Sequence, residues 1–201
     1  MPFTRDPLFW RAGAISSVTV MVAILVFLTA DTLHAMTPGE TGSHVPPYTV
    51  INQRISYEVD PATNDWRPVV GRKELIFDHE YTPAEAADLM RKGKLVLQSR
   101  ACMSCHTVFG NGGYYAPDLT KSWLDPVWQQ TWMPVTQKKT KDEAIAAFLM
   151  HPERYPTWSR QMPNLNIQRD EAIAMVAYLK WLSAIDTNGF PNNFGQRNEG
   201  R

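Results

Sequence analysis

The chain has 201 residues, and its 20 Lys and Arg balance its 20 Asp and Glu, so the formal net charge at neutral pH is zero. A composition without a basic surplus gives no sign of nucleic-acid binding. Two cysteines are too few for a disulfide-rich fold and too few for a metal site made of four thiolates. The length suits one ordinary domain with an additional segment.

An uncharged stretch near the N-terminus, residues 12–30, predicts a membrane-spanning helix. As an α-helix it would rise about 28 Å, close to the ~30 Å thickness of a hydrocarbon core. Arg5 and Arg11 precede it, so the positive-inside rule places residues 1–11 in the cytoplasm and the rest of the chain on the periplasmic side of the inner membrane. A cleaved signal peptide, whose apolar region usually has about 7–15 residues, and a buried core helix are the alternatives.

Residues 31–81 predict an extracytoplasmic connector with little helix. Its first part is rich in Pro, Gly and Thr, whereas residues 48–59 and 67–78 hold the β-branched and aromatic residues that favour strands. The intervening DPATNDW is typical of a turn. Because long connectors are usually functional or packed, we expect this one to lie against the next domain or against a partner.

Residues 82–185 predict a small all-α domain. The sequence TPAE, which begins at Thr82, has the form of a capping box, and the helix after it carries an apolar stripe that includes Gly93. A last helix is expected at about residues 168–185, followed by a polar tail, residues 186–201.

A short helix is expected between these two. The sequence TKDE at Thr140–Glu143 predicts a second capping box, and the helix that it opens must end before Pro152. The aromatic stretch before it, residues 121–140, gives no prediction of its role.

The motif CMSCH, residues 102–106, holds both cysteines and carries the strongest functional signal. Two cysteines three apart lie on one side of a helical turn, so their sulfurs can form thioethers with the two vinyl groups of a porphyrin. The histidine that follows can then bind the iron as proximal ligand. A thioredoxin-like pair would need a βαβ context, and a zinc site would need further ligands. We therefore predict one covalent heme c held by Cys102, Cys105 and His106.

Met162 is the candidate for the distal axial ligand. It lies in SRQMPNLNI, before the last predicted helix, where a thioether would raise the reduction potential of the iron. Met133, which also precedes a proline, His151 and an open sixth position are the alternatives. Pro117, in APDL, is expected to accept the hydrogen bond from His106 Nδ1 that orients a metal-bound imidazole, the alternative being a simple turn.

The order of these features resembles a class I cytochrome c domain, in which the first and last helices cross near Gly93 and an aromatic such as Tyr178 packs there. The apolar N-terminal run, the connector and the stretch CHTVFGNGGYYAPDLTK together resemble the cytochrome c subunit of bacterial nitric oxide reductase. This resemblance covers roughly residues 5–184.

The resemblance implies a partner, a large integral membrane subunit with b-type hemes and a non-heme iron that reduces NO to N₂O in denitrification. This chain would take electrons from a soluble periplasmic cytochrome c or small copper protein, pass them to a b-type heme, and catalyse nothing by itself. The resemblance also implies a calcium ion near the contact between the two proteins, bound partly by the backbone carbonyls of Gly112 and Tyr114. A loop that only packs on the heme or the partner is the alternative.

Three other functions stay open at this point. The chain can be a free-standing anchored cytochrome that shuttles electrons between complexes, or the cytochrome subunit of another heme–copper-type oxidase or reductase. A heme-based gas sensor is the third, and it would require an open sixth position on the iron. A stable partner with b-type heme would separate the reductase subunit from the shuttle.

Overall fold

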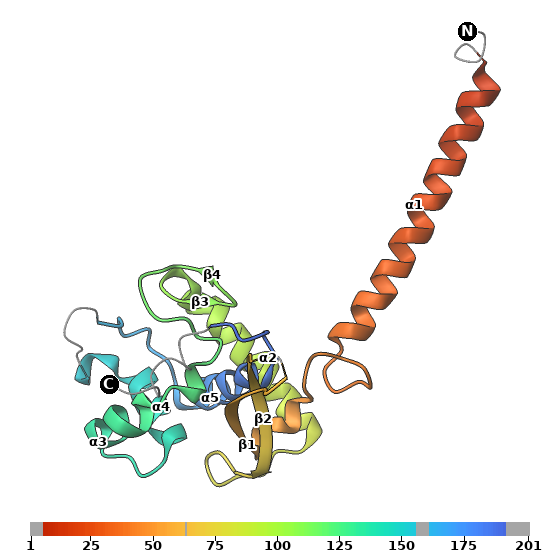
Figure 1. Ribbon diagram of the computed structural model, residues 1–201. Helices are drawn as coiled ribbons and strands as arrows, with labels where there is room; N and C mark the ends of the chain where they lie inside the picture. Colours follow the sequence, from red (N-terminus) through yellow and green to blue (C-terminus); the bar gives the residue numbers. More distant parts are fainter. Residues whose placement is uncertain (1–5, 63, 156–160, 192–201) are drawn as a thin grey trace. The chain divides into compact units, whose positions relative to one another are not determined.

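The structure is a computed structural model that describes residues 6–62, 64–155 and 161–191. The chain divides into two compact units, residues 1–45 and 46–201. Most of the first unit is a single helix, α1, and the second unit holds the remaining helices and strands (Figure 1). The outer parts of the predicted N-terminal segment and C-terminal tail, residues 1–5 and 192–201, lie outside the described residues.

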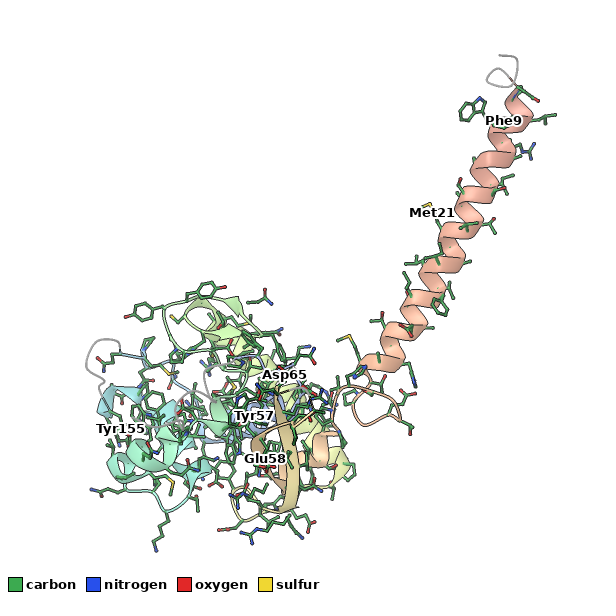
Figure 2. All side chains as sticks on the ribbon, in the orientation of Figure 1. Phe9, Met21, Tyr57, Glu58, Asp65 and Tyr155 are labelled. Atoms are coloured by element: carbon green, nitrogen blue, oxygen red, sulfur yellow. The ribbon has the colours of Figure 1, made fainter. Side chains whose placement is uncertain are left out.

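The first helix, α1 at Pro7–Met36, extends beyond both ends of the predicted apolar run. Asp6 caps it, because its carboxylate accepts the backbone N–H of Leu8 at 2.9 Å. Its large apolar side chains are exposed and point outward along the helix, as Phe9 and Met21 do in Figure 2. Within the described ranges it is the one helix long and apolar enough to cross a membrane, as the sequence predicts.

The second unit is mainly helical. Its α-helices are α2 (Pro83–Ser99), α3 (Met133–Thr136), α4 (Lys141–Met150) and α5 (Arg169–Ala184). Its strands are β1 (Gln53–Val59), β2 (Trp66–Lys73), β3 (Thr107–Val108) and β4 (Asn111–Gly112), which form two antiparallel pairs, β1 with β2 and β3 with β4. Single turns of 3₁₀-helix lie at Tyr48–Asn52, Cys102–Ser104, Ser122–Leu124 and Pro152–Arg154, and a π-helical turn lies at Trp128–Trp132.

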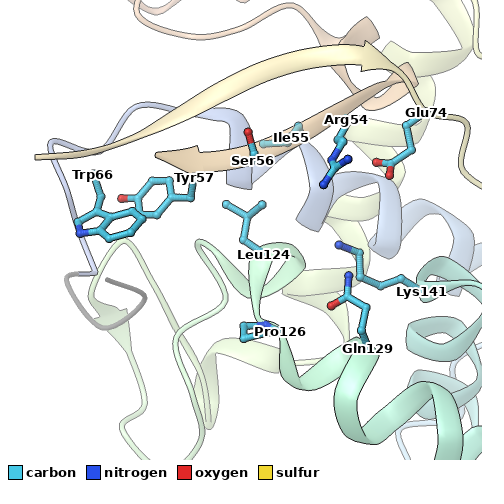
Figure 3. Close-up of a pocket in the computed structure, with 10 residues that line it drawn as sticks. All are labelled: Arg54, Ile55, Ser56, Tyr57, Trp66, Glu74, Leu124, Pro126, Gln129 and Lys141. Atoms are coloured by element: carbon cyan, nitrogen blue, oxygen red, sulfur yellow. The ribbon is translucent and has the colours of Figure 1, made fainter. Parts of the chain in front are cut away.

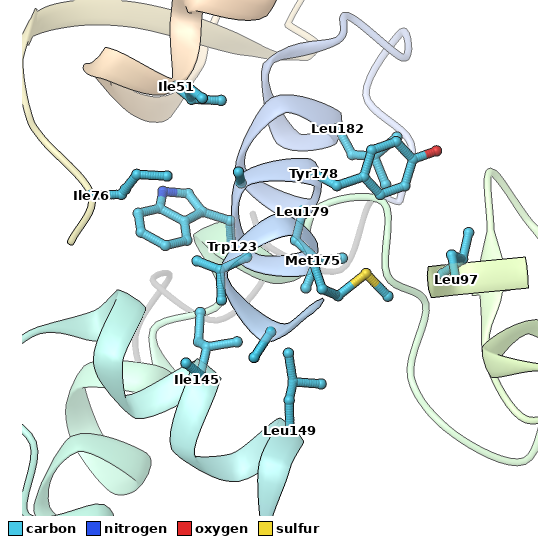
Figure 4. Close-up of a cluster of buried hydrophobic side chains, with 14 of the residues drawn as sticks. Ile51, Ile76, Leu97, Trp123, Ile145, Leu149, Met175, Tyr178, Leu179 and Leu182 are labelled. Carbon is cyan, nitrogen blue, oxygen red and sulfur yellow. The ribbon is translucent and has the colours of Figure 1, made fainter. Parts of the chain in front are cut away.

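Helices α2 and α5 cross at Gly93, as expected. A Cβ on Gly93 would lie 2.5 Å from the carbonyl oxygen of Ala174 and 2.6 Å from the Cβ of Tyr178, so only glycine allows this approach. Around α5, Figure 4 shows Leu97 of α2 on one side and Ile145 of α4 on another. This crossing therefore organises the core of the domain.

The connector packs on the helical domain. Ile51 and Ile76 are fully buried in the same core cluster as the α5 side chains. The buried ammonium group of Lys180 in α5 donates to the carbonyl oxygen of Glu74 at 3.1 Å. The compact unit that begins at Pro46 thus holds residues 46–81 of the connector together with the helices.

One predicted capping box is present and the other is wrong. Thr82 accepts the backbone N–H of Glu85, whose side chain accepts the N–H of Thr82 in return. Thr140 occupies the N-cap of α4, but its side chain makes no capping hydrogen bond. The physical reason is competition, because the Glu143 carboxylate that should return to Thr140 instead pairs with Arg169 of α5, with oxygens 2.5 and 3.0 Å from its nitrogens.

The aromatic stretch whose role the sequence left open packs on α4. The ring centroid of Trp132 lies 4.6 Å from that of Phe148, and that of Trp128 lies 6.0 Å from it. Between this stretch and the β1–β2 hairpin lies a cavity of about 300 Å³ with a mixed polar and apolar lining, into which Arg54 and Lys141 point (Figure 3). The cavity is lined by neither the CMSCH motif nor the segment around Met162, so it is separate from the candidate site.

Candidate heme site

The CMSCH motif begins immediately after α2. Ala101 adopts a left-handed conformation, with φ of 51°, and Cys102–Ser104 then form one turn of 3₁₀-helix. This turn is closed by the backbone N–H groups of Cys105 and His106, which both donate to the carbonyl oxygen of Cys102, at 3.2 and 3.0 Å. Cysteine, cysteine and histidine are thus held on a single tight turn.

Neither Cys102 nor Cys105 forms a disulfide bond. Cys102 is buried, with 7% of its surface exposed, and Cys105 is half-buried. Burial raises the pKa of the Cys102 thiol. Its place in the hydrophobic core cluster suits an apolar thioether bond better than an exposed reactive thiolate.

The imidazole of His106 is held by the expected hydrogen bond. Its Nδ1 lies 2.7 Å from the carbonyl oxygen of Pro117. Because a carbonyl oxygen can only accept a hydrogen bond, Nδ1 carries the proton and donates. In this tautomer Nε2 keeps its lone pair. Among the described residues Nε2 has no hydrogen-bond partner, so it is available to a metal.

The glycine-rich loop after the motif is tightly folded against it. A Cβ on Gly112 would lie 2.3 Å from the carbonyl oxygen of His106, and one on Gly113 would lie 2.1 Å from that of Ser104. The N–H of Gly113 donates to the carbonyl oxygen of Met103 at 2.8 Å. These glycines allow a close approach of two backbone segments, so the loop is a fixed cover on the motif.

The segment that carries Met162 is tied to the start of the motif through Arg100. One Arg100 nitrogen donates to the carbonyl oxygen of Leu165 at 3.2 Å, and another lies 2.8 and 2.9 Å from the two carboxylate oxygens of Glu171. Met162 is half-buried and packs on the core cluster that includes Cys102. Residues 156–160, which precede this segment, lie outside the described residues.

The two alternative ligands lie elsewhere in the fold. Met133 begins α3 and is not among the side chains that form or pack on the core cluster within the described residues. His151 follows the end of α4, where its Nδ1 lies 3.5 Å from a carboxylate oxygen of Glu153. This arrangement favours Met162, whose role as a ligand stays a prediction.

Comparison with known proteins places this geometry in a family. The family model described as cytochrome c matches residues 90–183, which include the CMSCH motif and Met162. The chain is 30% identical to the C subunit of nitric oxide reductase from Stutzerimonas stutzeri over 120 residues, 60% of this chain and 76% of that protein. It is 26% identical to the C subunit of nitric oxide reductase from Paracoccus denitrificans over 128 residues, 62% of this chain and 76% of that protein.

This chain belongs to the family of nitric oxide reductase C subunits. Because it contains a cytochrome c domain, this family member carries covalently bound heme c. The residues present fit that cofactor, because two cysteines lie three positions apart on one turn and the Nε2 of the adjacent imidazole has no hydrogen-bond partner among the described residues. A porphyrin with two vinyl groups and an iron needs this set of donors.

The calcium site expected at Gly112 and Tyr114 stays a prediction for this member of the family. Among the described residues there is no group of three or more His, Cys, Asp or Glu that could hold a metal ion.

Two residues whose side chains bond to this site were missed from the sequence. Arg100 donates to the carbonyl oxygen of Leu165, and the carboxylate of Asp118 accepts the hydroxyl of Thr107 and the N–H of Gly110. Each acts through contacts with residues distant in the sequence or separated by a loop, and a sequence gives no spacing rule for such contacts. The only signal was their position, since Arg100 precedes the motif by two residues and Asp118 follows Pro117 directly.

Proposed function

We propose that this chain is the electron-transfer subunit of a membrane-bound nitric oxide reductase. It takes electrons one at a time from a soluble periplasmic donor and passes them to a b-type heme of the catalytic subunit, which reduces NO to N₂O. The observation that carries the proposal is the His106–Pro117 hydrogen bond at 2.7 Å, because it prepares an axial ligand inside a chain related to the C subunits of nitric oxide reductases.

The residues of the site have separate roles. Cys102 and Cys105 hold the heme through thioether bonds, and His106 and Met162 are its proximal and distal axial ligands. The heme supplies a centre that gains and loses one electron. The Pro117 carbonyl fixes the proton of His106 on Nδ1, and this hydrogen bond makes Nε2 a stronger donor. The Met162 thioether favours the reduced iron, which raises the potential.

The packing of the connector supports a docked protein over a mobile shuttle. Of the predicted connector, residues 46–81 belong to the compact unit that holds the heme motif. Only residues 37–45 separate α1 from this unit, and they hold hydrogen bonds such as that from Gly39 N–H to the carbonyl oxygen of Val45, at 2.9 Å. We place α1 in the inner membrane and the heme domain on the periplasmic side.

The loop over the motif is the proposed contact with the catalytic subunit. Tyr114 is 82% exposed and Tyr115 is 52% exposed, an unusual position for two neighbouring aromatic residues. Aromatic side chains of this kind are enriched in protein interfaces. The close packing of Gly112 and Gly113 fixes the backbone of this loop, which would allow the carbonyls of Gly112 and Tyr114 to bind a calcium ion at the contact.

Rapid mixing of the oxidised complex with a reduced soluble donor tests the electron route. The heme c of this chain should be reduced first and a b-type heme second, and a Cys105→Ala, His106→Ala double variant that lacks the heme should leave the b-type heme oxidised. Reduction of the b-type heme at an unchanged rate in that variant would show that electrons bypass this chain.

A further inference from the structure

The segment that carries Pro117 runs beside the end of the CMSCH motif. The N–H of Ala116 donates to the carbonyl oxygen of Cys105 at 2.9 Å, and that of Leu119 donates to the carbonyl oxygen of Thr107 at 2.8 Å. These two bonds enclose the His106–Pro117 hydrogen bond from both sides. The position of the Pro117 carbonyl therefore depends on how firmly residues 116–119 are held.

Asp118 holds this segment with its side chain. One carboxylate oxygen accepts the hydroxyl of Thr107 at 2.6 Å and the backbone N–H of Gly110 at 3.2 Å. The other accepts the N–H of Thr120 at 2.8 Å. Thr107 is only 5% exposed, so its hydroxyl would lose a partner inside the protein if this carboxylate were removed.

A second contact reinforces the same connection. The buried hydroxyl of Thr120 accepts the N–H of Phe109 at 2.7 Å. Phe109 and Gly110 both have positive φ, 50° and 76°, so the chain turns sharply here. The side chains of Asp118 and Thr120 thus hold the turn after the motif onto the segment that carries Pro117.

We propose that Asp118 is a positioning residue for the proximal histidine. It acts through Thr107 and the backbone of residues 116–119 to hold the Pro117 carbonyl against Nδ1 of His106, and so sets how strongly the imidazole donates to the iron. This inference rests on the proposed role of His106 as axial ligand. The proposed roles of Cys102, Cys105 and Met162 do not depend on this positioning role of Asp118.

The test uses the heme-loaded, full-length protein in Asp118→Asn, Thr107→Val and Thr107→Ser variants. Asp118→Asn keeps the shape but replaces one acceptor oxygen with a donor, and Thr107→Val removes the hydroxyl at equal volume. Thr107→Ser restores the hydroxyl. Thr136→Val is the matched control, because within the described part of the chain this buried hydroxyl bonds only the backbone before it, at Trp132 and Met133.

The first measurement is the rate at which the His106 Nδ1 proton exchanges with solvent. NMR of the reduced protein measures this rate. Loss of one hydrogen bond corresponds to exchange that is faster by about five- to tenfold, and we expect this in Asp118→Asn and Thr107→Val. Thr107→Ser and Thr136→Val should exchange as the wild type does. The reduction potential should rise in the first two variants, since a weaker hydrogen bond makes the imidazole a poorer donor to ferric iron.

Unchanged exchange in Thr107→Val, with heme attached, would overturn the positioning role. If Asp118→Asn does not fold, the Thr107→Val and Thr107→Ser pair decides the question alone. A rise in potential in Asp118→Asn without faster exchange would also contradict the proposal, because it would reflect only the lost charge. A wild-type spectrum without histidine ligation would instead overturn the proposed function itself.

Discussion

Gly93 of α2 and Tyr178 of α5 lie so close that a methyl group on residue 93 would be 2.6 Å from the Cβ of Tyr178. The same methyl group would meet the Ala174 carbonyl oxygen at 2.5 Å, and backbone cannot rotate away as a side chain can. Gly93→Ala must therefore separate the helices that form the core. We expect a loss of about 1–3 kcal/mol in the free energy of unfolding, measured by denaturant titration.

Gly71→Ala is the matched control for this prediction. A Cβ there would lie 3.6 Å from the nearest atom, the carbonyl oxygen of Arg54, which is ordinary contact. Its unfolding free energy should stay within about 0.5 kcal/mol of the wild type. Equal losses in the two variants would mean that the helix crossing does not limit stability.

Replacement of Met162 tests the distal ligand. The red charge-transfer band of ferric heme ligated by methionine should be present in the wild type and absent in Met162→Ala. The reduction potential should fall in the same variant, because the thioether favours reduced iron. Met133→Ala should keep both properties, and a normal band in Met162→Ala would remove Met162 from the site.

Arg100 links the CMSCH motif to the segment that carries Met162. Its replacement should therefore lower the free energy of unfolding and remove this link. In Arg100→Gln the charge-assisted contact of one Arg100 nitrogen with both Glu171 oxygens and the bond to the Leu165 carbonyl are lost, at a cost of about 1–3 kcal/mol in unfolding free energy. The pKa of Glu171, which is lowered by the N–H of Gln168 and by Arg100, should rise. NMR titration of Glu171 and denaturant unfolding would measure these changes.

An exposed ion pair provides the comparison for Arg100. Arg91 lies 2.9 Å from Asp88 on the solvent face of α2. Arg91→Gln should change the unfolding free energy by less than about 0.5 kcal/mol, because exposed pairs contribute little. Similar losses in Arg91→Gln and Arg100→Gln would indicate a general charge effect.

Stability above neutral pH should depend on Lys121. Its side chain is fully buried at the end of α5, where it donates to the carbonyl oxygens of Ser183 and Ile185, and burial lowers its pKa from 10.5 to about 8. The folded protein therefore releases this proton at lower pH than the unfolded chain does. The free energy of unfolding should rise between pH 8 and 10.5, by at most about 1.4 kcal/mol per pH unit from this group.

Denaturant unfolding at several pH values checks this dependence. The stability of the wild type relative to Lys121→Met should increase as the pH rises through 8. Lys94→Met, at an exposed position of α2, should give a curve parallel to that of the wild type. Parallel curves for the wild type and Lys121→Met would show that burial does not perturb Lys121.

The local features of this protein could be predicted from its sequence, whereas contacts between distant segments could not. The capping box at Thr82, the crossing at Gly93 and the hydrogen bond from His106 to Pro117 each follow from a short pattern or from the family resemblance. The predicted box at Thr140 is wrong because Arg169, 26 residues beyond Glu143, takes the carboxylate. The roles of Arg100 and Asp118 likewise depend on partners that only folding brings close.

Thr82 and Thr140 allow a direct comparison between a capping box that is present and one that is absent. Thr82→Ala should cost about 1 kcal/mol, because its side chain accepts a helix N–H that would otherwise be unpaired. Thr140→Ala should cost less, since Thr140 makes no side-chain capping bond. Thermal or denaturant unfolding of both variants measures the difference, and a larger loss at Thr140 would contradict the geometry at α4.

The heme content of the complex purified through this chain tests the central claim most directly. Gentle solubilisation of the membrane and capture by a tag on this chain should yield one covalent heme c together with b-type heme in a stable large partner protein. Pyridine hemochrome spectra distinguish the two heme types in one sample. Recovery of this chain with heme c alone, and without b-type heme, would contradict its assignment as a docked component of nitric oxide reductase.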